Sequence, residues 1–171
     1  ATCVAPNVYV ANITSNTADV HWAPGYYESA WNFEYKEQND TVWTPVTNAT
    51  SPVQLTGLIP NTHYSVRVQS DCGSETSPWT IRDFTTECAA VTIPYTQNFD
   101  HDGTGSNAHP SCWSWKNNYS TTTAYPYIST SYHTSGTAGL YFYCSTPTYN
   151  LAVSPQIDLT NTQMNSLQVS F

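Results

Sequence analysis

Two acidic residues in a glycine-containing segment are the strongest metal-ligand candidates in the sequence. Asp100 and Asp102 lie within the stretch 98–103, where Gly103 permits a sharp bend. Carboxylates two residues apart can present oxygen atoms to a structural Ca²⁺ ion. Asp158, in a Ser-Pro-Gln-Ile-Asp turn, is a candidate third ligand. The EF-hand spacing is not met, because no glutamate closes the loop, so a solvated acidic loop is the alternative interpretation.

Residues for covalent or acid–base catalysis are poorly arranged. The chain has five histidines but no Gly-x-Ser-x-Gly nucleophile elbow. Cys112 and His109 are the nearest thiol and imidazole in sequence, and a disulfide cysteine beside a loop histidine is the favoured interpretation of them. A catalytic triad further needs a base held by an orienting acid. We therefore expect that this chain is not an enzyme.

Aromatic residues are dense between positions 113 and 149. Aromatic faces can stack on sugar rings, while neighbouring Asn, Asp and Thr side chains supply hydrogen bonds. Tyr125, Tyr127 and Tyr132 lie in a Thr/Ser-rich segment and are candidates for an exposed ligand-binding set. Other aromatic residues of this region are expected to fill a β-sandwich core: Trp113, Trp115, Tyr141 and Tyr143.

The chain is acidic and poor in cations. It has 12 Asp and Glu against 4 Lys and Arg, for a net charge of −8. The four cations lie far apart in sequence and cannot build a basic patch: Lys36, Arg67, Arg82 and Lys116. Nucleic acid and anionic membrane surfaces are therefore not expected as partners. No apolar run is long enough to predict membrane insertion.

The five cysteines indicate an oxidising compartment. They are Cys3, Cys72, Cys88, Cys112 and Cys144, and no two form a Cys-x-x-Cys pair. A zinc site is therefore not expected, and disulfides are the better interpretation. The chain begins without a signal peptide, so we expect a mature or excised product.

Alternation of apolar and polar residues, rather than helical periodicity, runs through the first half. It predicts seven short strands, near 8–10, 18–22, 31–35, 42–46, 53–55, 64–68 and 79–85. Turn-forming residues separate these segments. Seven short strands within about 85 residues favour a β-sandwich.

A corner motif indicates the Greek-key type. Pro60 precedes Tyr64, after which Val66 and Val68 alternate along a strand. The Tyr64 hydroxyl is expected to hydrogen-bond back to the backbone of the corner, and Trp22 to form the core block on which the strand packs.

These features closely resemble a fibronectin type III domain. The resemblance covers residues 3–86 and is carried by Trp22, Leu58, Pro60, Thr62, Tyr64 and the closing Phe84-Thr85-Thr86. It implies a module that supplies spacing and surface rather than chemistry.

The resemblance also implies a disulfide. In such a sandwich the first strand begins at the pole where the sixth ends, so a Cys3–Cys72 bridge is expected. Cys88 ends the last strand at the opposite pole and should belong to the next domain. For that domain Cys88–Cys112 is favoured, and Cys112–Cys144 is the alternative.

The second half resembles the jelly-roll adhesin modules of Bacteroidetes surface proteins, called choice-of-anchor J or cleaved adhesin domains and related to MAM domains. Three sequence motifs carry the resemblance: Pro-Tyr-x-x-x-Phe-Asp at 94–100, Pro-Ser-Cys-Trp at 110–113 and Ser-Pro-Gln-Ile-Asp-Leu at 154–159. The resemblance implies calcium near the opening strand. About 80 residues are too few for a whole eight-stranded jelly roll. We therefore expect segment 166–171 to be an open strand, completed by missing chain or by another molecule.

Thr41 is a candidate modification site. Asp40-Thr41-Val42 resembles the O-glycosylation acceptor of Bacteroidetes proteins and falls on a predicted turn. An ordinary turn threonine is the alternative interpretation.

Together these observations predict an all-β chain. A seven-stranded fibronectin type III sandwich (1–87) is followed by a short linker (88–92) and a partial jelly-roll β-sandwich (93–171). We expect a non-catalytic adhesion or binding module of a larger secreted or cell-surface protein, with a glycan or an extracellular protein as ligand. The alternatives are an accessory region of a secreted protease or glycoside hydrolase, and a subunit of an extracellular filament that self-associates through its open final strand.

Overall fold

The computed structural model describes residues 2–105, 108–118, 126–142, 149–160 and 168–169. This part of the chain contains β-strands and no helix, which confirms the predicted all-β class. The chain divides into two compact units, Ala1–Ala89 and Ala90–Phe171. Each unit is described by itself below.

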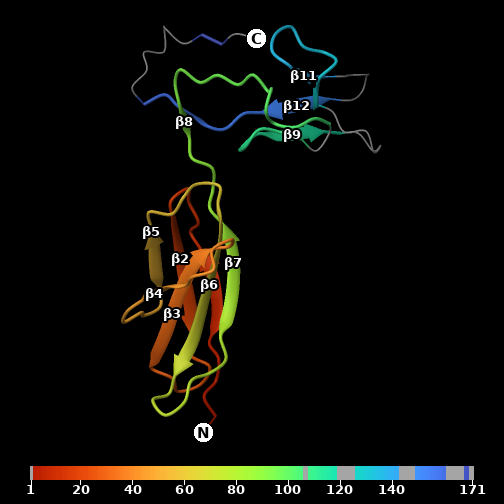
Figure 1. The fold of residues 1–171 in the computed structure, drawn as a ribbon. Coiled ribbons are helices and arrows are strands. Elements are labelled where there is room, and N and C mark those ends of the chain that lie inside the picture. The colour runs from red at the N-terminus through yellow and green to blue at the C-terminus, as the bar shows by residue number, and fades with distance from the viewer. Residues whose placement is uncertain (1, 106–107, 119–125, 143–148, 161–167, 170–171) are drawn as a thin grey trace. The chain divides into compact units, whose positions relative to one another are not determined.

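Unit 1 is a sandwich of two antiparallel sheets (Figure 1). A three-stranded sheet has the order β1-β2-β5, and a four-stranded sheet has the order β4-β3-β6-β7. The strands are β1 (Asn7–Ala11), β2 (Thr17–Ala23), β3 (Ala30–Glu37), β4 (Thr44–Val46), β5 (Val53–Thr56), β6 (His63–Asp71) and β7 (Thr80–Thr85). The seven strands expected from the sequence are therefore all present.

The predicted alternation sets which side chains fill the sandwich. In β2, Ala18, Val20 and Trp22 are buried, whereas the residues between them are partly exposed. Phe33 on β3 is 1% exposed and stacks on the Trp22 ring with 5.7 Å between the ring centroids. Because successive strand side chains point to opposite faces, this register places the apolar row of each sheet in one shared core.

The corner before β6 has the predicted tyrosine bond. The Ile59 backbone N–H donates to the Tyr64 hydroxyl at 3.0 Å. Tyr64 is 4% exposed, and its ring stacks on Phe84 at 5.7 Å. Gly57, with φ of +70°, makes the turn that leads into this corner, a conformation that glycine adopts without strain. The tyrosine corner is therefore confirmed.

The described part of unit 2 forms three two-stranded pairings. β9 (Ser114–Asn117) pairs with β12 (Asn150–Val153), and β10 (Tyr127–Ser129) pairs with β11 (Gly139–Tyr141), both antiparallel. β8 (Val91–Thr92) and β13 (Ile157–Asp158) pair in parallel. The jelly-roll assignment of this unit stays a prediction, and most of the expected final strand lies outside the described residues.

Two tryptophans organise the interior of unit 2. The Trp113 indole N–H donates to the Tyr95 hydroxyl at 2.8 Å, and its ring meets Phe99 edge-on at 5.5 Å. The Trp115 indole N–H donates to the Ala108 carbonyl at 3.0 Å. Both rings are half-buried and have satisfied N–H groups, as a core role requires. Tyr143, expected beside them, lies outside the described residues.

Candidate binding site

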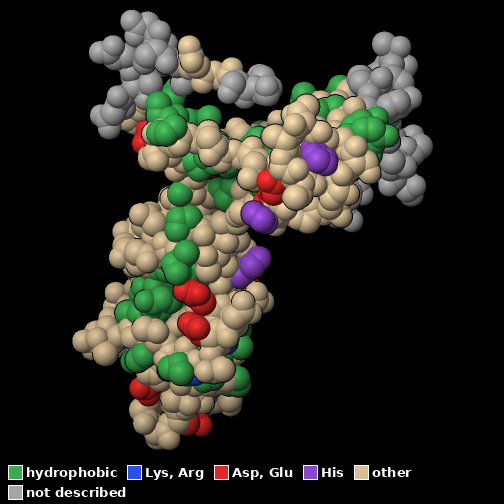
Figure 2. Space-filling model, turned by 45° about the horizontal axis from the view of Figure 1, so that its top comes forward, with side chains coloured by type: hydrophobic (Ala, Val, Ile, Leu, Met, Phe, Trp, Pro, Cys, Tyr) green, Lys and Arg blue, Asp and Glu red, His purple; other side chains and the backbone are tan. Residues whose placement is uncertain are grey.

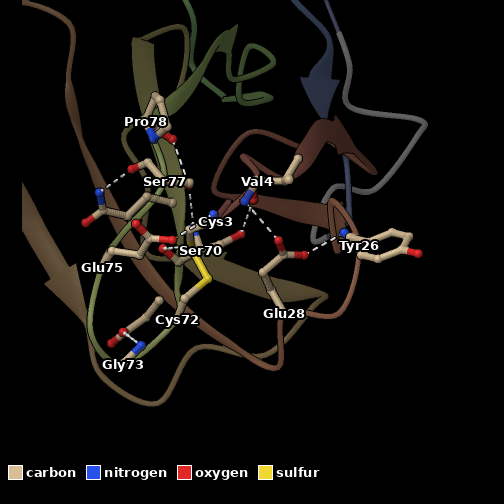
Figure 3. Close-up of a disulfide and its surroundings, with 12 residues drawn as sticks. Cys3, Val4, Tyr26, Glu28, Ser70, Cys72, Gly73, Glu75, Ser77 and Pro78 are labelled. Carbon is tan, nitrogen blue, oxygen red and sulfur yellow. Dashed lines mark hydrogen bonds between the residues drawn. A yellow bond between two sulfur atoms is a disulfide. The ribbon is translucent and has the colours of Figure 1, made fainter. Parts of the chain in front are cut away.

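A disulfide ties the start of unit 1 to the end of its longest strand (Figure 3). Cys3 and Cys72 are bonded, with 6.0 Å between their Cα atoms and 69 residues between them in sequence. This is the pairing expected from the family resemblance. It joins the segment that precedes β1 to the residue that follows β6, at one pole of the sandwich.

The Glu28 carboxylate holds the β2–β3 connection against the N-terminal segment. It accepts the Tyr26 backbone N–H at 2.6 Å and the Val4 backbone N–H at 2.9 Å (Figure 3). These two bonds lower the pKa of Glu28 below its ordinary value, because hydrogen bonds to the charged form favour it. Gly25 lies so close to Val4 that a Cβ atom there would overlap the valine side chain. The β2–β3 connection is therefore held against the N-terminal segment by the Glu28 carboxylate and by the close packing of Gly25 on Val4.

The β6–β7 connection is fixed to the same segment. The Cys3 N–H donates to the Glu75 carboxylate at 3.1 Å, and the Ser70 hydroxyl donates to the Val4 carbonyl at 2.7 Å. Hydrogen bonds and the disulfide thus connect three segments that are remote in sequence: the N-terminal segment, the β2–β3 connection and the β6–β7 connection. These contacts tie the three segments to one another at this pole.

Two adjacent tyrosines stand out from this anchored pole. Tyr26 is 69% exposed and Tyr27 is 81% exposed. Their ring centroids are 3.9 Å apart, and the Tyr27 hydroxyl donates to the Tyr26 hydroxyl at 3.2 Å, which raises the pKa of Tyr27. In Figure 3 the Tyr26 ring points away from the disulfide and the carboxylates. We call these two residues the tyrosine pair.

The tyrosine pair is not among the site residues predicted from the sequence. The signal available was an aromatic dipeptide directly after a Pro-Gly turn, Pro24-Gly25-Tyr26-Tyr27. A turn brings its residues to the surface, so two large aromatic residues there have no strand to pack them inward.

The pole around the tyrosine pair carries only negative charge. Residues 2–5, 24–29 and 71–77 include Glu28, Asp71 and Glu75 and contain no Lys, Arg or His. Figure 2 shows a face of the molecule on which acidic side chains are visible and basic ones barely appear.

The predicted glycan-binding tyrosines of unit 2 meet around a residue expected in the core. Tyr132 stacks on Tyr141 with centroids 4.6 Å apart, and Tyr127 contacts Tyr141 at 5.2 Å. Tyr132 is 58% exposed, as predicted, whereas Tyr127 is half-buried because β10 pairs it with Tyr141 on β11. Tyr141 is only half-buried and belongs with this set. Tyr125 lies outside the described residues.

The three candidate calcium ligands are not brought together. The Asp100 carboxylate accepts the backbone N–H groups of Thr137 at 2.6 Å and Ala138 at 3.0 Å, and these bonds lower its pKa. Asp158 accepts the backbone N–H and the hydroxyl of Thr160, which lower its pKa.

Within the described ranges, no group of three or more His, Cys, Asp or Glu side chains could hold a metal ion. Asp100, Asp102 and Asp158 therefore do not form the expected triad. The first and last of these carboxylates are instead occupied by protein N–H and hydroxyl donors. Calcium binding by this unit stays a prediction.

The remaining predicted site residues are placed as follows. Thr41 is exposed in the bend between β3 and β4 and stays a candidate modification site. Cys88 and Cys112 are both disulfide-bonded, and Cys144 lies outside the described residues. Their pairing stays a prediction. Among the described residues no helix is long and apolar enough to cross a membrane.

The family comparison decides what unit 1 is. The model of the fibronectin type III domain matches residues 4–82, the stretch that contains the tyrosine corner and both sheets except the end of β7. Residues 4–82 are a fibronectin type III domain. Such domains are common extracellular binding and scaffold modules, generally without catalysis, and their presence here with disulfides is consistent with an extracellular protein.

Among the solved structures that are similar to this chain, two cover about half of it. One is a computer-based redesign of a β-sandwich protein, 30% identical, which covers 51% of this chain and 98% of its own, with a TM-score of 0.45. Another, described as a myokine structure, is 24% identical and covers 50% of this chain and 99% of its own, also with a TM-score of 0.45. No curated protein matches the chain.

Proposed function

We propose that this chain is a non-catalytic binding module of a larger secreted or cell-surface protein, and that its fibronectin type III domain contacts a protein ligand through the tyrosine pair. One observation carries this proposal. Tyr26 and Tyr27 are the two most exposed aromatic residues among the described large hydrophobic side chains. They stand on a connection that Glu28 and the Cys3–Cys72 anchor hold in place.

The anchored backbone is what makes the tyrosine pair suited to binding. Binding by a mobile loop costs the free energy of ordering it, and a loop ordered beforehand avoids that cost. Tyrosine adds a large amphipathic contact surface with only two side-chain torsions to fix. The tyrosine pair therefore combines contact area with a small entropic cost.

The charge of the pole indicates the kind of ligand. Glu28, Asp71 and Glu75 belong to segments 24–29 and 71–77, which are bound to the same N-terminal segment and contain no Lys, Arg or His. Lys and Arg side chains of a ligand would be attracted to these carboxylates and could lie over the exposed tyrosine rings. The module would serve equally in an adhesin or as the accessory region of a secreted hydrolase, since both need attachment rather than chemistry.

A binding assay with matched variants tests the proposal. The full chain is applied to immobilised fibrinogen, laminin and type I collagen, and binding is measured by surface plasmon resonance. We expect saturable binding to at least one of them, weakened at least tenfold by Y26S/Y27S. The control is Tyr9→Ser, because Tyr9 is 56% exposed on β1 of the same domain. Equal binding by wild type and Y26S/Y27S, or no binding to any of the three, contradicts the proposal.

A second candidate function is glycan binding by unit 2. It is favoured by the exposed Tyr132 ring, which Tyr141 supports from one side at 4.6 Å. A supported aromatic ring offers its other face to an apolar sugar face. For at least one glycan on an array probed with the full chain, Tyr132→Ala should remove the binding, and Tyr149→Ala, at another exposed tyrosine of the unit, should retain it. An array without binding removes this candidate.

A further inference from the structure

The outer face of the four-stranded sheet carries a stack of charged and aromatic side chains. On neighbouring strands β3 and β6, Glu34 and Arg67 are in register, and the guanidinium forms two contacts with the same carboxylate oxygen, at 2.5 and 2.7 Å. The guanidinium carbon also lies 4.2 Å from the centre of the Trp43 ring and 4.4 Å from that of Trp79. This stack holds the Trp79 indole in position and neutralises the Glu34 charge.

A groove lies beside this stack. Its volume is about 430 Å³, and it crosses the sheet from Pro45 next to β3 to Trp79 next to β7. It opens where it does because β4 has only three residues, paired with Phe33–Tyr35, so the start of β3 has no neighbour on that side. The chain then turns away at Asn48, whose φ is +55°. A volume of this size falls in the range of small-molecule sites.

The groove is lined by amides, by the indoles of Trp31 and Trp79 and by other apolar side chains, rather than by unpaired charges. The Asn32 amide donates to Gln69 at 3.2 Å, and the Gln69 amide donates to the Ser77 carbonyl at 2.9 Å. These two bonds fix the Gln69 amide. The side-chain oxygen of Asn32 and the side-chain amide of Asn48 have no hydrogen-bond partner among the described residues. Glu34, the one carboxylate of the lining, is engaged by Arg67.

The geometry points to a binding site for a neutral carbohydrate chain in this groove, a site separate from the tyrosine pair and from Tyr132. Amide side chains both donate and accept, which matches the hydroxyl groups of a sugar, each of which does the same. The Trp79 indole and the Pro45 ring offer apolar surface to the C–H faces of a pyranose. A charged ligand finds no unpaired counter-charge here, since Glu34 and Arg67 satisfy each other.

The test uses the full chain and four neutral hexasaccharides: cellohexaose, mannohexaose, maltohexaose and xylohexaose. Binding is followed by the NMR signal of the Trp79 indole N–H and by calorimetry. We expect at least one hexasaccharide to shift this signal in a saturable way. Removal of two exposed amides, in Asn32→Ala with Asn48→Gly, should weaken that binding about tenfold, because each lost hydrogen bond to the sugar lowers the affinity severalfold. Glycine is used at position 48 because φ there is +55°.

Controls separate this site from the others. Y26S/Y27S and Tyr132→Ala should bind the same hexasaccharide as wild type does, and an acidic hexamer of galacturonic acid should leave the Trp79 signal unchanged. Both amides are exposed, and glycine adopts the positive φ of position 48 without strain, so their removal should leave the melting temperature nearly unchanged. The inference is overturned if none of the four neutral probes shifts the Trp79 signal. It is equally overturned if the double amide variant binds as tightly as wild type, or if the acidic hexamer competes.

Discussion

The bond from Ile59 N–H to the Tyr64 hydroxyl should make a measurable contribution to the stability of the fibronectin type III domain. The substitution Tyr64→Phe removes the hydroxyl and keeps the ring, which is 4% exposed and packed on Phe84. No cavity larger than the lost oxygen results, so the main cost is an N–H group without an acceptor. For a buried donor that cost is about 1–3 kcal/mol. The bond is only partly buried, so we expect about 1–2 kcal/mol.

A urea titration of the full chain, followed by the NMR signal of the Trp22 indole, measures this change. Trp22 lies in the core of the same domain and so reports on that domain alone. For a domain of this size the expected loss corresponds to a melting temperature lower by about 4–16 °C. Tyr9→Phe is the matched control, because the Tyr9 ring is 56% exposed and stacked on His21. If Tyr64→Phe and Tyr9→Phe are equally stable within about 0.5 kcal/mol, the corner bond does not contribute as argued.

Further perturbations should act through the contacts described above. Replacing Cys3 and Cys72 by serine opens a loop closed over 69 residues and should cost about 4 kcal/mol in urea titrations; an unchanged midpoint would refute this. The pKa of Asp100 is lowered, so its bonds should hold above the ordinary Asp value of 3.8 and be lost as pH falls through the lowered pKa; an NMR titration midpoint of the bonded amides at or above 3.8 would contradict this. Gly136→Ala should disturb the same bonds at neutral pH, because its φ is +68° and a Cβ atom would overlap the Asp100 carboxylate; unchanged amide shifts would speak against this contact. Arg67→Met should lower the free energy of unfolding of the domain by about 1–2 kcal/mol, because the contacts of Arg67 with two indoles are lost. An unchanged free energy of unfolding would show that these contacts do not stabilise the domain.

The sandwich could be predicted from the sequence because local patterns determine it. Alternation alone places Val20 and Trp22 inward, and the register of β2 with its neighbours follows. The Tyr64 corner joins residues only five apart, so it too is visible in sequence. The disulfide pairing followed once the family resemblance gave the strand order.

The tyrosine pair and the role of Asp100 could not be predicted in the same way, because both depend on contacts between distant residues. The exposure of Tyr26 depends on bonds that Glu28 makes to Val4, 24 residues away. Asp100 has its partners 37 and 38 residues later, at Thr137 and Ala138. A pair of carboxylates near a glycine looks like a cation site until those partners are known.

Amide hydrogen exchange at Tyr26 and Val4 tests most directly whether the tyrosine pair stands on a preformed pole. Both N–H groups donate to the Glu28 carboxylate, at 2.6 and 2.9 Å. In the unliganded full chain at neutral pH, both should exchange more slowly than in a free peptide, and Glu28→Ala should remove that protection while leaving the β6 amides unchanged. Exchange at free-peptide rates in the wild-type chain would show that the tyrosine pair belongs to a mobile loop, and would contradict the proposed binding mode.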